Sequence, residues 1–386
     1  MGFLDQAKYL KARVNKSMSK NIFYTKSFKW LPSKVYAEKF DAKWHRVYEK
    51  ITIEHLPPTF YGSGVANLQG KLDNEFPETG LLELESALLF GQQGWIFSKE
   101  GYFLPDHSWY SQHVTEITKV KSLPRPKYWK SSTKYLGGIC LTLCSDFAVK
   151  SYAHFLLDCI SRLHLFRQAG FKVSDIDYFF CPKPPSRTAQ NLFSQLGIPD
   201  DKCIWADNNK QRMLRAEKLL APTFPGTRRN YPEWLPTFLK NEFLSELPFK
   251  GRRLYISRTG CRRNVINEEA IERILSKYDF EIYNPIEHED QPLDFAEAAV
   301  VVAPHGGGLS NLAFCQQGTK ILELIPSDHI HPYYYTLSNA ASLEYSCMVC
   351  RSTHERGMNA WGPSSYDFYV EENEFDNALS KITFGI

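Results

Sequence analysis

The stretch AVVVAPHGGGLSNLAFCQQGTKILELIP, at positions 299–326, decides the fold of this sequence. An apolar run leads into Pro304, His305 and the glycines at 306–308, and a second apolar run follows at 320–325. Such short apolar runs, separated by a helical segment, are typical of buried parallel strands. Glycines directly after a strand let an anion approach backbone N–H groups, and the next helix presents its positive end. We therefore expect a ligand site at this edge; a tight turn that needs positive φ is the alternative.

Strands and helices alternate through the rest of the C-terminal half. The expected strands are 253–257, 280–283, 299–303 and 320–325, and the expected helices are 268–277, 292–298 and 309–314. Parallel strands need a long crossover between them, which is usually a helix. This alternation therefore predicts a Rossmann-like domain with helices on both faces of its sheet.

The preceding part of the chain shows the same alternation after a less regular beginning. Residues 51–118 contain apolar stretches separated by Gly and Pro, which are typical of short antiparallel strands. Beyond them we expect strands at 139–144, 177–181, 203–206 and 218–222, and helices at 152–169, 186–196 and 232–247. A chain of 386 residues exceeds what one core usually supports. We therefore expect two facing α/β domains, at 51–248 and 249–386, preceded by a basic extension at 1–50.

The composition indicates a folded globular protein and gives no reason to expect a nucleic-acid partner. Hydrophobic residues make up 43% of the chain, and 46 basic residues against 43 acidic ones give a formal net charge of +3. Nine cysteines, an odd number, favour reduced thiols over a disulfide framework. The sequence shows neither an apolar run of about 18 residues nor a secretory signal, so we expect a cytoplasmic location.

The first part of the chain is strongly basic. Lysine and arginine recur from Lys8 to Lys34 without an acidic residue among them, and aromatic side chains such as Tyr9 and Trp30 lie between them. Segments of this kind dock on anionic lipid surfaces. The segment is therefore a candidate for peripheral contact with the inner face of the cell membrane, and a solvated terminal arm is the alternative.

Cations gather where the strand at 253–257 ends. Arg258, Arg263 and Asn264 follow this strand, and parallel strands bring their carboxyl ends to one edge of the sheet. A helix terminus contributes about 0.3–1 kcal/mol, whereas micromolar binding needs about 8 kcal/mol, so fixed guanidinium groups are also required. We expect Arg258 and Arg263 to neutralise a diphosphate, a task that a metal ion performs in many enzymes. Solvated surface arginines are the alternative.

Two carboxylates are candidates for roles in a site. Glu323 interrupts an apolar strand, and a buried carboxylate needs partners, either ribose hydroxyls or an internal Arg or Lys. In the helix that begins near residue 152, His154, Asp158 and Arg162 share one face. We expect His154 or Asp158 to take a proton from a hydroxyl group. An exposed Asp158–Arg162 ion pair beside a structural histidine is the alternative.

Two pairs of residues have the spacing of metal ligands. Asp175 and Asp177 form a D-x-D pattern, but they precede a strand, so we expect them in a solvated loop. Cys347 and Cys350 lie in one expected strand without a second pair nearby. We therefore expect no metal at either position.

Three ordered blocks of sequence resemble glycosyltransferase family 61, which includes bacterial capsular polysaccharide glycosyltransferases. The blocks are SYAHFLLD at 151–158, RLYISR with RRNVINEE at 253–269, and VVAPHGGGLSNLAFCQQGTKILELIP at 301–326. The resemblance spans residues 140–350. It implies a GT-B fold, transfer with inversion, no metal or other cofactor, and a UDP-sugar donor such as UDP-N-acetylglucosamine or UDP-xylose. Where the family motif often reads His-Gly-Ala-Gly, this chain has Gly307, an equally small residue.

The resemblance also assigns the candidate residues to parts of the site. The diphosphate is expected at Arg258, Arg263, Asn264, Gly306, Gly307, Gly308 and Leu309, and the nucleoside and sugar at His305, Ser310, Asn311 and Glu323. His154 and Asp158 fall in a helix that faces the cleft. Either of them is a candidate for the base that activates a hydroxyl of a glycan or lipid-linked glycan acceptor.

The sequence thus predicts an inverting, metal-independent glycosyltransferase of the bacterial, cytoplasmic branch, which acts in capsular or other cell-surface polysaccharide biosynthesis. Two other functions stay open. A non-catalytic glycan-binding or assembly protein would keep a cleft without needing nucleotide affinity, and an NAD-dependent oxidoreductase would use the Rossmann-like domain. The lack of a G-x-G-x-x-G motif argues against the oxidoreductase.

Overall fold

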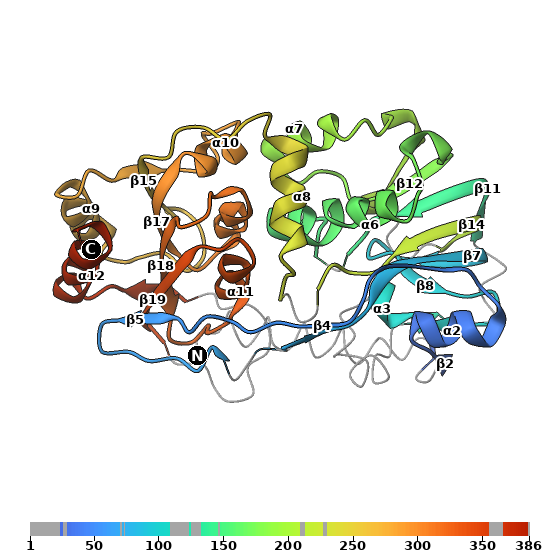
Figure 1. The fold of residues 1–386 in the computed structure, drawn as a ribbon, viewed down its shortest axis with the longest axis horizontal. Coiled ribbons are helices and arrows are strands. Elements are labelled where there is room, and N and C mark those ends of the chain that lie inside the picture. Colours follow the sequence, from blue (N-terminus) through green and yellow to red (C-terminus); the bar gives the residue numbers. More distant parts are fainter. Residues whose placement is uncertain are drawn as a thin grey trace, which may run out of the picture.

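The computed structural model describes residues 24–25, 29–69, 72, 74–108, 123–124, 133–145, 147–208, 213–226, 230–354 and 366–384. These residues form a nine-stranded sheet, a seven-stranded sheet and two small two-stranded sheets. Figure 1 shows the two large sheets toward opposite ends of an elongated molecule, with helices between them. The expected mixed α/β fold with parallel strands is confirmed.

The nine-stranded sheet has a parallel part and an antiparallel part. The parallel strands lie in the order β13 (Cys203–Trp205), β12 (Tyr178–Cys181), β11 (Thr133–Thr142) and β14 (Met213–Pro222). The antiparallel part continues through β7 (Thr79–Phe90), β8 (Trp95–Phe97) and β9 (Tyr102–Phe103). The antiparallel strands expected within 51–118 are therefore present, although β7, with 12 residues, is long.

Residues from the expected N-terminal extension take part in this sheet. Strand β3 (Trp44–Tyr48) pairs with β7, and β2 (Lys29–Trp30) pairs with β9. Gly80 allows the first pairing, because a Cβ atom there would lie 2.2 Å from the backbone oxygen of His45. The small sheets are β1 (Tyr24–Thr25) with β10 (Leu123–Pro124), and β4 (Ile51–Thr52) with β6 (Glu75–Phe76).

The seven-stranded sheet is parallel through its centre. Its strands lie in the order β16 (Glu281–Tyr283), β15 (Arg252–Ile256), β17 (Ala298–Pro304), β18 (Lys320–Pro326) and β19 (Glu344–Ser352). β20 (Phe368–Tyr369) pairs antiparallel with β19, and β5 (Thr59–Tyr61) pairs parallel with it. The chain runs from β15 to β16 on one side and returns to β17 on the other, so the strand order reverses between β15 and β17.

Helices cover both faces of the seven-stranded sheet, as the alternation predicted. On one face lie α9 (Glu268–Ser276) and α12 (Glu372–Phe384), and on the other lie α10 (Gln291–Ala296), η8 (Gly307–Phe314) and α11 (Tyr333–Ala340). The segment η8 is a 3-10 helix that begins two residues before the expected helix at 309–314. The nine-stranded sheet carries the helical segments α2 (Ser33–Phe40), α3 (Pro105–Ser108), η5 (Val173–Asp175), α7 (Arg187–Gln195), η6 (Asp200–Lys202), η7 (Ala206–Asn208) and α8 (Trp234–Phe243).

The helix expected at 152–169 consists of three segments. α5 (Tyr152–His154) is followed by a π-helical segment, η4 (Phe155–Ile160), and then by α6 (Arg162–Gln168). Short π-helical segments are frequent at functional sites. All residues of η4 are buried, including Asp158, whereas His154 lies at the edge of the core.

One hydrophobic core joins the two halves of the molecule. It contains Phe155 and Leu192 from the first half together with Ile256 and Leu312 from the second. Helix α8 packs against η8 and α11, and Figure 1 shows it between the two sheets. The chain also crosses between the halves early, because β5 precedes β7 in sequence but pairs with the other sheet.

Arg162 is the largest of the completely buried side chains. Its Nη1 donates to the carbonyl oxygen of Cys144 at 2.5 Å, and its Nε donates to that of Pro222 at 3.0 Å. The guanidinium group thereby ties together the chain segments that leave β11 and β14. An exposed Asp158–Arg162 ion pair, the alternative interpretation, is wrong because both side chains are buried.

Most of the basic segment between Lys8 and Lys34 lies outside the described residues, so its predicted membrane contact stays a prediction. Among the helices that the structure describes, none is long and apolar enough to cross a bilayer.

We expect Arg162→Met to lower the free energy of unfolding by about 3 kcal/mol or more, because two buried carbonyl oxygens lose a charged donor. Urea denaturation measures this change. The control is Arg167→Met in the same helix, whose side chain is 34% exposed and pairs with Glu242 at 2.6 Å. A surface pair contributes about 0–1 kcal/mol, so equal losses in the two variants would contradict the role of Arg162.

Candidate functional site

A cavity of about 430 Å³ lies at the carboxyl edge of the seven-stranded sheet. It opens where the strand order reverses between β15 and β17, the position at which open α/β sheets bind ligands. Arg258, Gly307 and Gly308 line it from the second half, and Tyr152 and Arg187 line it from the first. The cavity is therefore at the edge of the sheet where the glycine-rich stretch predicted a ligand site.

Three polar contacts between the halves surround this cavity. Arg187 at the start of α7 pairs with Glu289 at 2.7 Å, and the neighbouring Thr188 donates to the carbonyl oxygen of His288 at 3.5 Å. The Tyr152 hydroxyl donates to Asn311 Oδ1 at 2.6 Å. A ligand in the cavity is thus held between elements of both halves.

The glycines after β17 serve packing and access. Gly306 has an extended backbone (φ 175°), and an added Cβ atom would lie 1.8 Å from Nη1 of Arg258. A Cβ atom on Gly307 would meet no atom within 4 Å, whereas one on Gly308 would lie 3.2 Å from Ile256. None of these glycines lies in the left-handed region that a tight turn would need, so the tight-turn alternative is wrong. Gly306 instead makes room for the guanidinium group of Arg258.

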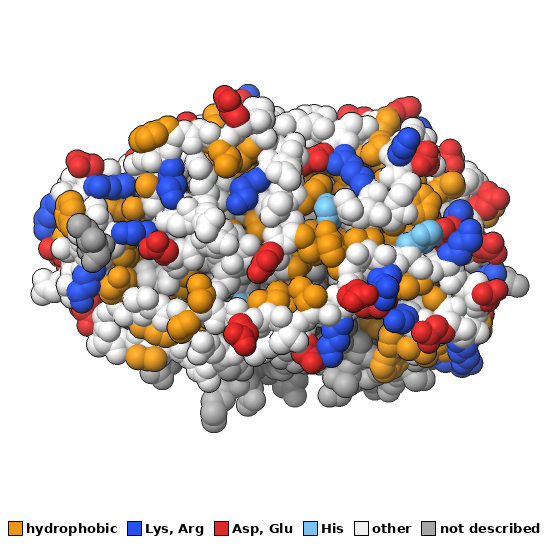
Figure 2. Space-filling view, viewed as in Figure 1, with side chains coloured by type: hydrophobic (Ala, Val, Ile, Leu, Met, Phe, Trp, Pro, Cys, Tyr) orange, Lys and Arg blue, Asp and Glu red, His pale blue; other side chains and the backbone are white. Residues whose placement is uncertain are grey.

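Arginines concentrate positive charge beside the glycines. Arg258 donates from Nε and Nη2 to the carbonyl oxygen of Arg262 at 3.2 and 2.8 Å, and Arg263 donates from Nε to that of His305 at 3.3 Å. Burial lowers the pKa of Arg263, and the nearby charges of Arg258 and Arg262 act in the same direction. This concentration of positive charge is local. Elsewhere, on the face that Figure 2 displays, charges of both signs are scattered.

Of four residues predicted to bind the diphosphate or the nucleoside, one lines the cavity and three do not. Leu309 lines the cavity, whereas Asn264 does not, and its N–H donates to Asp367 Oδ1 at 2.8 Å. Ser310 and Asn311 are buried. The Ser310 hydroxyl donates to the Gly307 carbonyl at 2.6 Å, and Asn311 Nδ2 donates to Gln291 Oε1 at 2.7 Å. Ser310 and Asn311 therefore hold η8 in place beneath the cavity.

Glu323 forms the centre of a buried polar chain. Its Oε1 lies 2.5 Å from Nδ1 of His305, and its Oε2 accepts from the Tyr345 hydroxyl at 2.5 Å. Glu323 and His305 are both buried and are absent from the cavity wall. Burial and the charge of Glu323 raise the pKa of Tyr345 far above its usual value, so the phenol stays a donor. The carboxylate is thus satisfied by His305 and Tyr345, and not by an Arg or Lys.

A second hydrogen-bonded series of a histidine, a carboxylate and a tyrosine lies in the first half of the molecule. His154 Nδ1 lies 2.5 Å from Asp158 Oδ2, and the Tyr231 hydroxyl donates to Asp158 Oδ1 at 3.2 Å. The side chain of Asp158 is 1% exposed, whereas that of His154 is 17% exposed. Because Nδ1 faces the carboxylate, Nε2 is the ring nitrogen of His154 that can take a proton from a ligand.

Sequence reasoning missed the tyrosines of both chains and the wall formed by Ser186, Arg187 and Thr188. Tyr231 is 73 residues from Asp158, and Tyr345 is 22 residues from Glu323. No local pattern links residues at such separations. The helix at 186–196 was expected, but nothing in the sequence indicated that its first residues line the cavity. Ser186 is the N-cap, and its hydroxyl accepts from the Ala189 N–H at 3.1 Å.

The residues with metal-ligand spacing serve other purposes. Asp175 Oδ2 accepts from the Lys172 N–H at 2.8 Å, and Asp177 Oδ2 accepts from the Ile139 N–H at 2.8 Å. Cys347 and Cys350 are buried free thiols in β19. Throughout the described ranges, no group of three or more His, Cys, Asp or Glu side chains is arranged to hold a metal ion.

Comparisons with known proteins point to one family. Residues 152–322 match the family model of Glycosyltransferase 61. A stretch of 96 residues is 29% identical to the Beta-1,2-xylosyltransferase RCN11 of Oryza sativa subsp. japonica. This alignment covers 25% of the chain and 16% of the rice protein. The matched range includes Arg258, Arg263, the glycines at 306–308, His305 and the His154–Asp158 pair, and it ends one residue before Glu323.

We expect Gly306→Ala to weaken the binding of inorganic pyrophosphate about tenfold or more, because the new methyl group displaces the Arg258 guanidinium and its charged hydrogen bonds to the anion. Gly307→Ala is the matched control, since its methyl group meets open space, and its affinity should stay within about twofold of the wild type. Isothermal titration calorimetry measures both. Unchanged binding by Gly306→Ala would show that Arg258 does not hold the anion.

Proposed function

We propose that this protein, whose residues 152–322 match the family model of Glycosyltransferase 61, is a member of that family and transfers a sugar from a nucleotide-sugar donor to a hydroxyl group of a glycan. The observation that carries this proposal is the cavity at the reversal of strand order, which lies within the matched residues and is lined by Arg258 and the glycine loop. A diphosphate is the ligand group that such a basic, backbone-lined edge accommodates.

The donor is a UDP-sugar in this proposal, and its diphosphate lies against Arg258, Gly307 and Gly308. Arg263 adds charge from behind, and Leu309 borders the nucleoside. We assign Ser310 and Asn311 the task of holding these groups in place, because their side chains engage protein partners, and Asn264 contributes through its backbone N–H to Asp367. His305 and Glu323 support the loop from within the core. The arrangement is of the GT-B type, with residues 51–248 on the acceptor side and 249–386 on the donor side.

His154 is the base in the proposed reaction. Asp158 is buried and both of its oxygens have partners, so it cannot reach an acceptor, whereas His154 is partly exposed at the start of a helix that packs on η8. Asp158 is then the positioning residue that fixes the imidazole with Nε2 toward the acceptor. This orientation follows the general logic of a carboxylate that holds a histidine base.

The chemistry is a single displacement. The acceptor hydroxyl gives its proton to His154 Nε2, and its oxygen forms a bond to the anomeric carbon. The bond from that carbon to the diphosphate oxygen breaks on the opposite face, and the electron pair leaves with UDP. The anomeric configuration is therefore inverted. Arg258 and Arg263 stabilise the negative charge that develops on the leaving diphosphate, which is the role that a metal fills in other transferases.

The transferred sugar and the acceptor are proposed from similarity. The rice relative is named a xylosyltransferase, which favours a pentose as the transferred sugar. The resemblance to bacterial capsular polysaccharide glycosyltransferases favours a cell-surface polysaccharide or its lipid-linked precursor as the acceptor. Contact of the basic segment at 8–34 with an anionic membrane would bring the enzyme to such a precursor.

We expect UDP to raise the apparent melting temperature more than ADP, GDP or NAD does, since a ligand that binds only the folded state stabilises it by about 2.7 kcal/mol at 100 times its dissociation constant. Addition of EDTA should leave the UDP effect unchanged. Differential scanning fluorimetry measures both. Stabilisation by NAD alone would favour the oxidoreductase, and no response to any nucleotide would favour a non-catalytic glycan-binding protein.

We expect His154→Ala to lower the rate of sugar transfer about 10²- to 10⁴-fold while UDP affinity is retained, because the acceptor loses its base. Asp158→Asn should lower the rate about 10²-fold or more, because the amide no longer fixes the imidazole. The control is Asp175→Asn, which removes an exposed carboxylate at 3-10 helix η5. Single-turnover assays measure the rates. Full activity of both site variants, with an intact fold, would rule out this base.

A further inference from the structure

A second cavity, of about 790 Å³, lies under the segment that crosses between the two halves. We call residues 53–61 the strap; they follow β4 and end in β5 (Figure 1). The strap is anchored on α11, because the Leu56 N–H donates to Asn339 Oδ1 at 2.8 Å and the Tyr335 hydroxyl donates to the Leu56 carbonyl at 2.5 Å. We call the space below it the strap cavity. Its volume lies within the range of small-molecule sites, about 300–1,000 Å³.

The strap cavity is separate from the donor cavity. It is lined by Lys320 and Glu344, the first residues of β18 and β19, and is therefore at the amino edge of the seven-stranded sheet. The donor cavity lies at the carboxyl edge of the same sheet, and the two share no lining residue. A ligand of the strap cavity is thus a different molecule, or a different part of a molecule, from the nucleotide.

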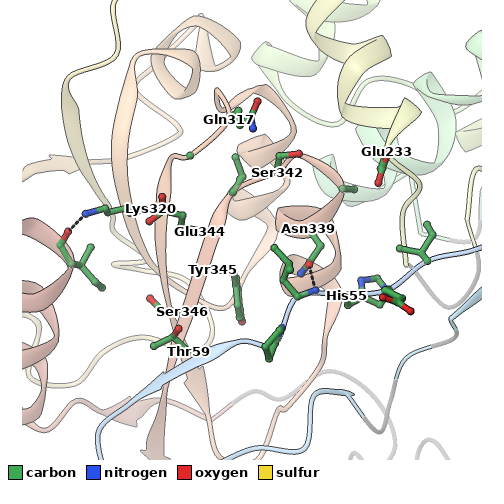
Figure 3. A pocket seen from close by; sticks show the side chains of 18 of the residues that line it. His55, Thr59, Glu233, Gln317, Lys320, Asn339, Ser342, Glu344, Tyr345 and Ser346 are labelled. Carbon is green, nitrogen blue, oxygen red and sulfur yellow. Dashed lines mark hydrogen bonds between the residues drawn. The ribbon is translucent and has the colours of Figure 1, made fainter. Parts of the chain in front are cut away.

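The polar groups around the strap cavity favour a ligand rich in hydroxyl groups. Within the described part of the chain, the exposed carboxylates of Glu233 and Glu344 have no hydrogen-bond or ion-pair partner, and the two buried ring nitrogens of His55 have none either. Carboxylates accept hydrogen bonds, and a neutral imidazole both donates and accepts. Burial lowers the pKa of His55 and so favours this neutral form. Figure 3 shows Glu233, Glu344 and His55 around one open space.

The charges of the strap cavity disfavour an anionic ligand. The ammonium group of Lys320 donates to the Ile382 carbonyl at 2.9 Å, and Figure 3 shows it directed toward that oxygen. Lys381 also lines the cavity, so its wall carries two cations against the carboxylates of Glu54, Glu233 and Glu344, and this acidic excess disfavours a phosphate or a uronic acid. Hydroxyl groups, in contrast, supply the donors that the carboxylates lack. The site therefore differs in chemistry from the arginine-rich donor cavity.

Two tyrosines connect the strap cavity to the buried polar chains. Tyr231 and Tyr345 both line it, while their hydroxyls donate to Asp158 and Glu323 respectively. Their hydroxyls are thus engaged on the protein side, and the rings supply apolar surface to the cavity. A ligand in the strap cavity would contact the same tyrosine that orients the Asp158–His154 pair.

We propose that the strap cavity binds an uncharged oligosaccharide segment, with Glu233 and Glu344 accepting hydrogen bonds from its hydroxyl groups. Binding does not require the donor cavity to be occupied or transfer to occur. The site holds glycan away from the reacting atoms, because it lies at the amino edge of the sheet and the proposed nucleotide site lies at the carboxyl edge.

The test measures saccharide binding to the whole protein without a nucleotide. Xylohexaose, mannohexaose, cellohexaose and maltohexaose are the neutral probes, and spermidine and pyrophosphate are the charged probes, each titrated by calorimetry. We expect at least one neutral hexaose to bind. The double variant Glu233→Gln with Glu344→Gln should bind it at least tenfold more weakly, and Ala340→Phe, which fills the cavity, should abolish binding.

Controls separate this proposal from the proposed transfer. Glu246→Gln changes an exposed carboxylate that lines neither cavity, and its saccharide affinity should equal that of the wild type. Each strap-cavity variant should keep the circular dichroism spectrum and the cooperative thermal unfolding of the wild type, which shows without any nucleotide that the variant is folded. Lack of binding by all four hexaoses, equal binding by the double variant, or a preference for spermidine would each overturn the proposal, whatever the outcome of the nucleotide screen.

Discussion

The reversal of strand order between β15 and β17 is the constraint on which the rest of the site depends. Because β16 and β17 lie on opposite sides of β15, the chain segments that leave β15 and β17 cannot cover the space between them. Arg258 and Gly306 leave the sheet at this point and approach so closely that a Cβ atom at Gly306 has no room. The first half closes the remaining side through Tyr152 and α7. A cationic cavity with walls from both halves follows from this one feature of topology.

Buried carboxylates impose a second constraint, because each needs partners for both of its oxygens. The structure shows the same arrangement twice, with a histidine Nδ1 beside one carboxylate oxygen and a tyrosine hydroxyl that donates to the other. In the Asp158 chain the histidine is partly exposed, with Nδ1 held by the carboxylate. In the Glu323 chain the histidine is buried beside the loop after β17. The same arrangement thus leaves one histidine at the edge of the core and the other inside it.

Most strands were predictable from the sequence, because parallel strands that are buried on both faces appear there as continuous apolar runs. Strand β3 was not, since WHRVY is polar and only half-buried, and it joins the sheet through its pairing with β7. The glycine loop and Arg258 were found because they follow strands directly. The surroundings of Glu323 were not found, because Tyr345 meets it through the pairing of β18 with β19, which no local pattern specifies. Sequence reasoning therefore pointed to the edge of the sheet where the cavity lies, but not to the burial of Asp158 and Glu323 away from the cavity wall.

Tyr231 connects the wall of the strap cavity with the Asp158–His154 pair. It lies beside the start of α8, the helix that packs between the halves, and its ring faces the strap cavity while its hydroxyl holds Asp158. The neighbouring π-helical segment η4 buries Asp158 and leaves His154 at its edge. Tyr231 therefore forms part of the wall of the proposed glycan site, and its hydroxyl holds the carboxylate that positions the proposed base.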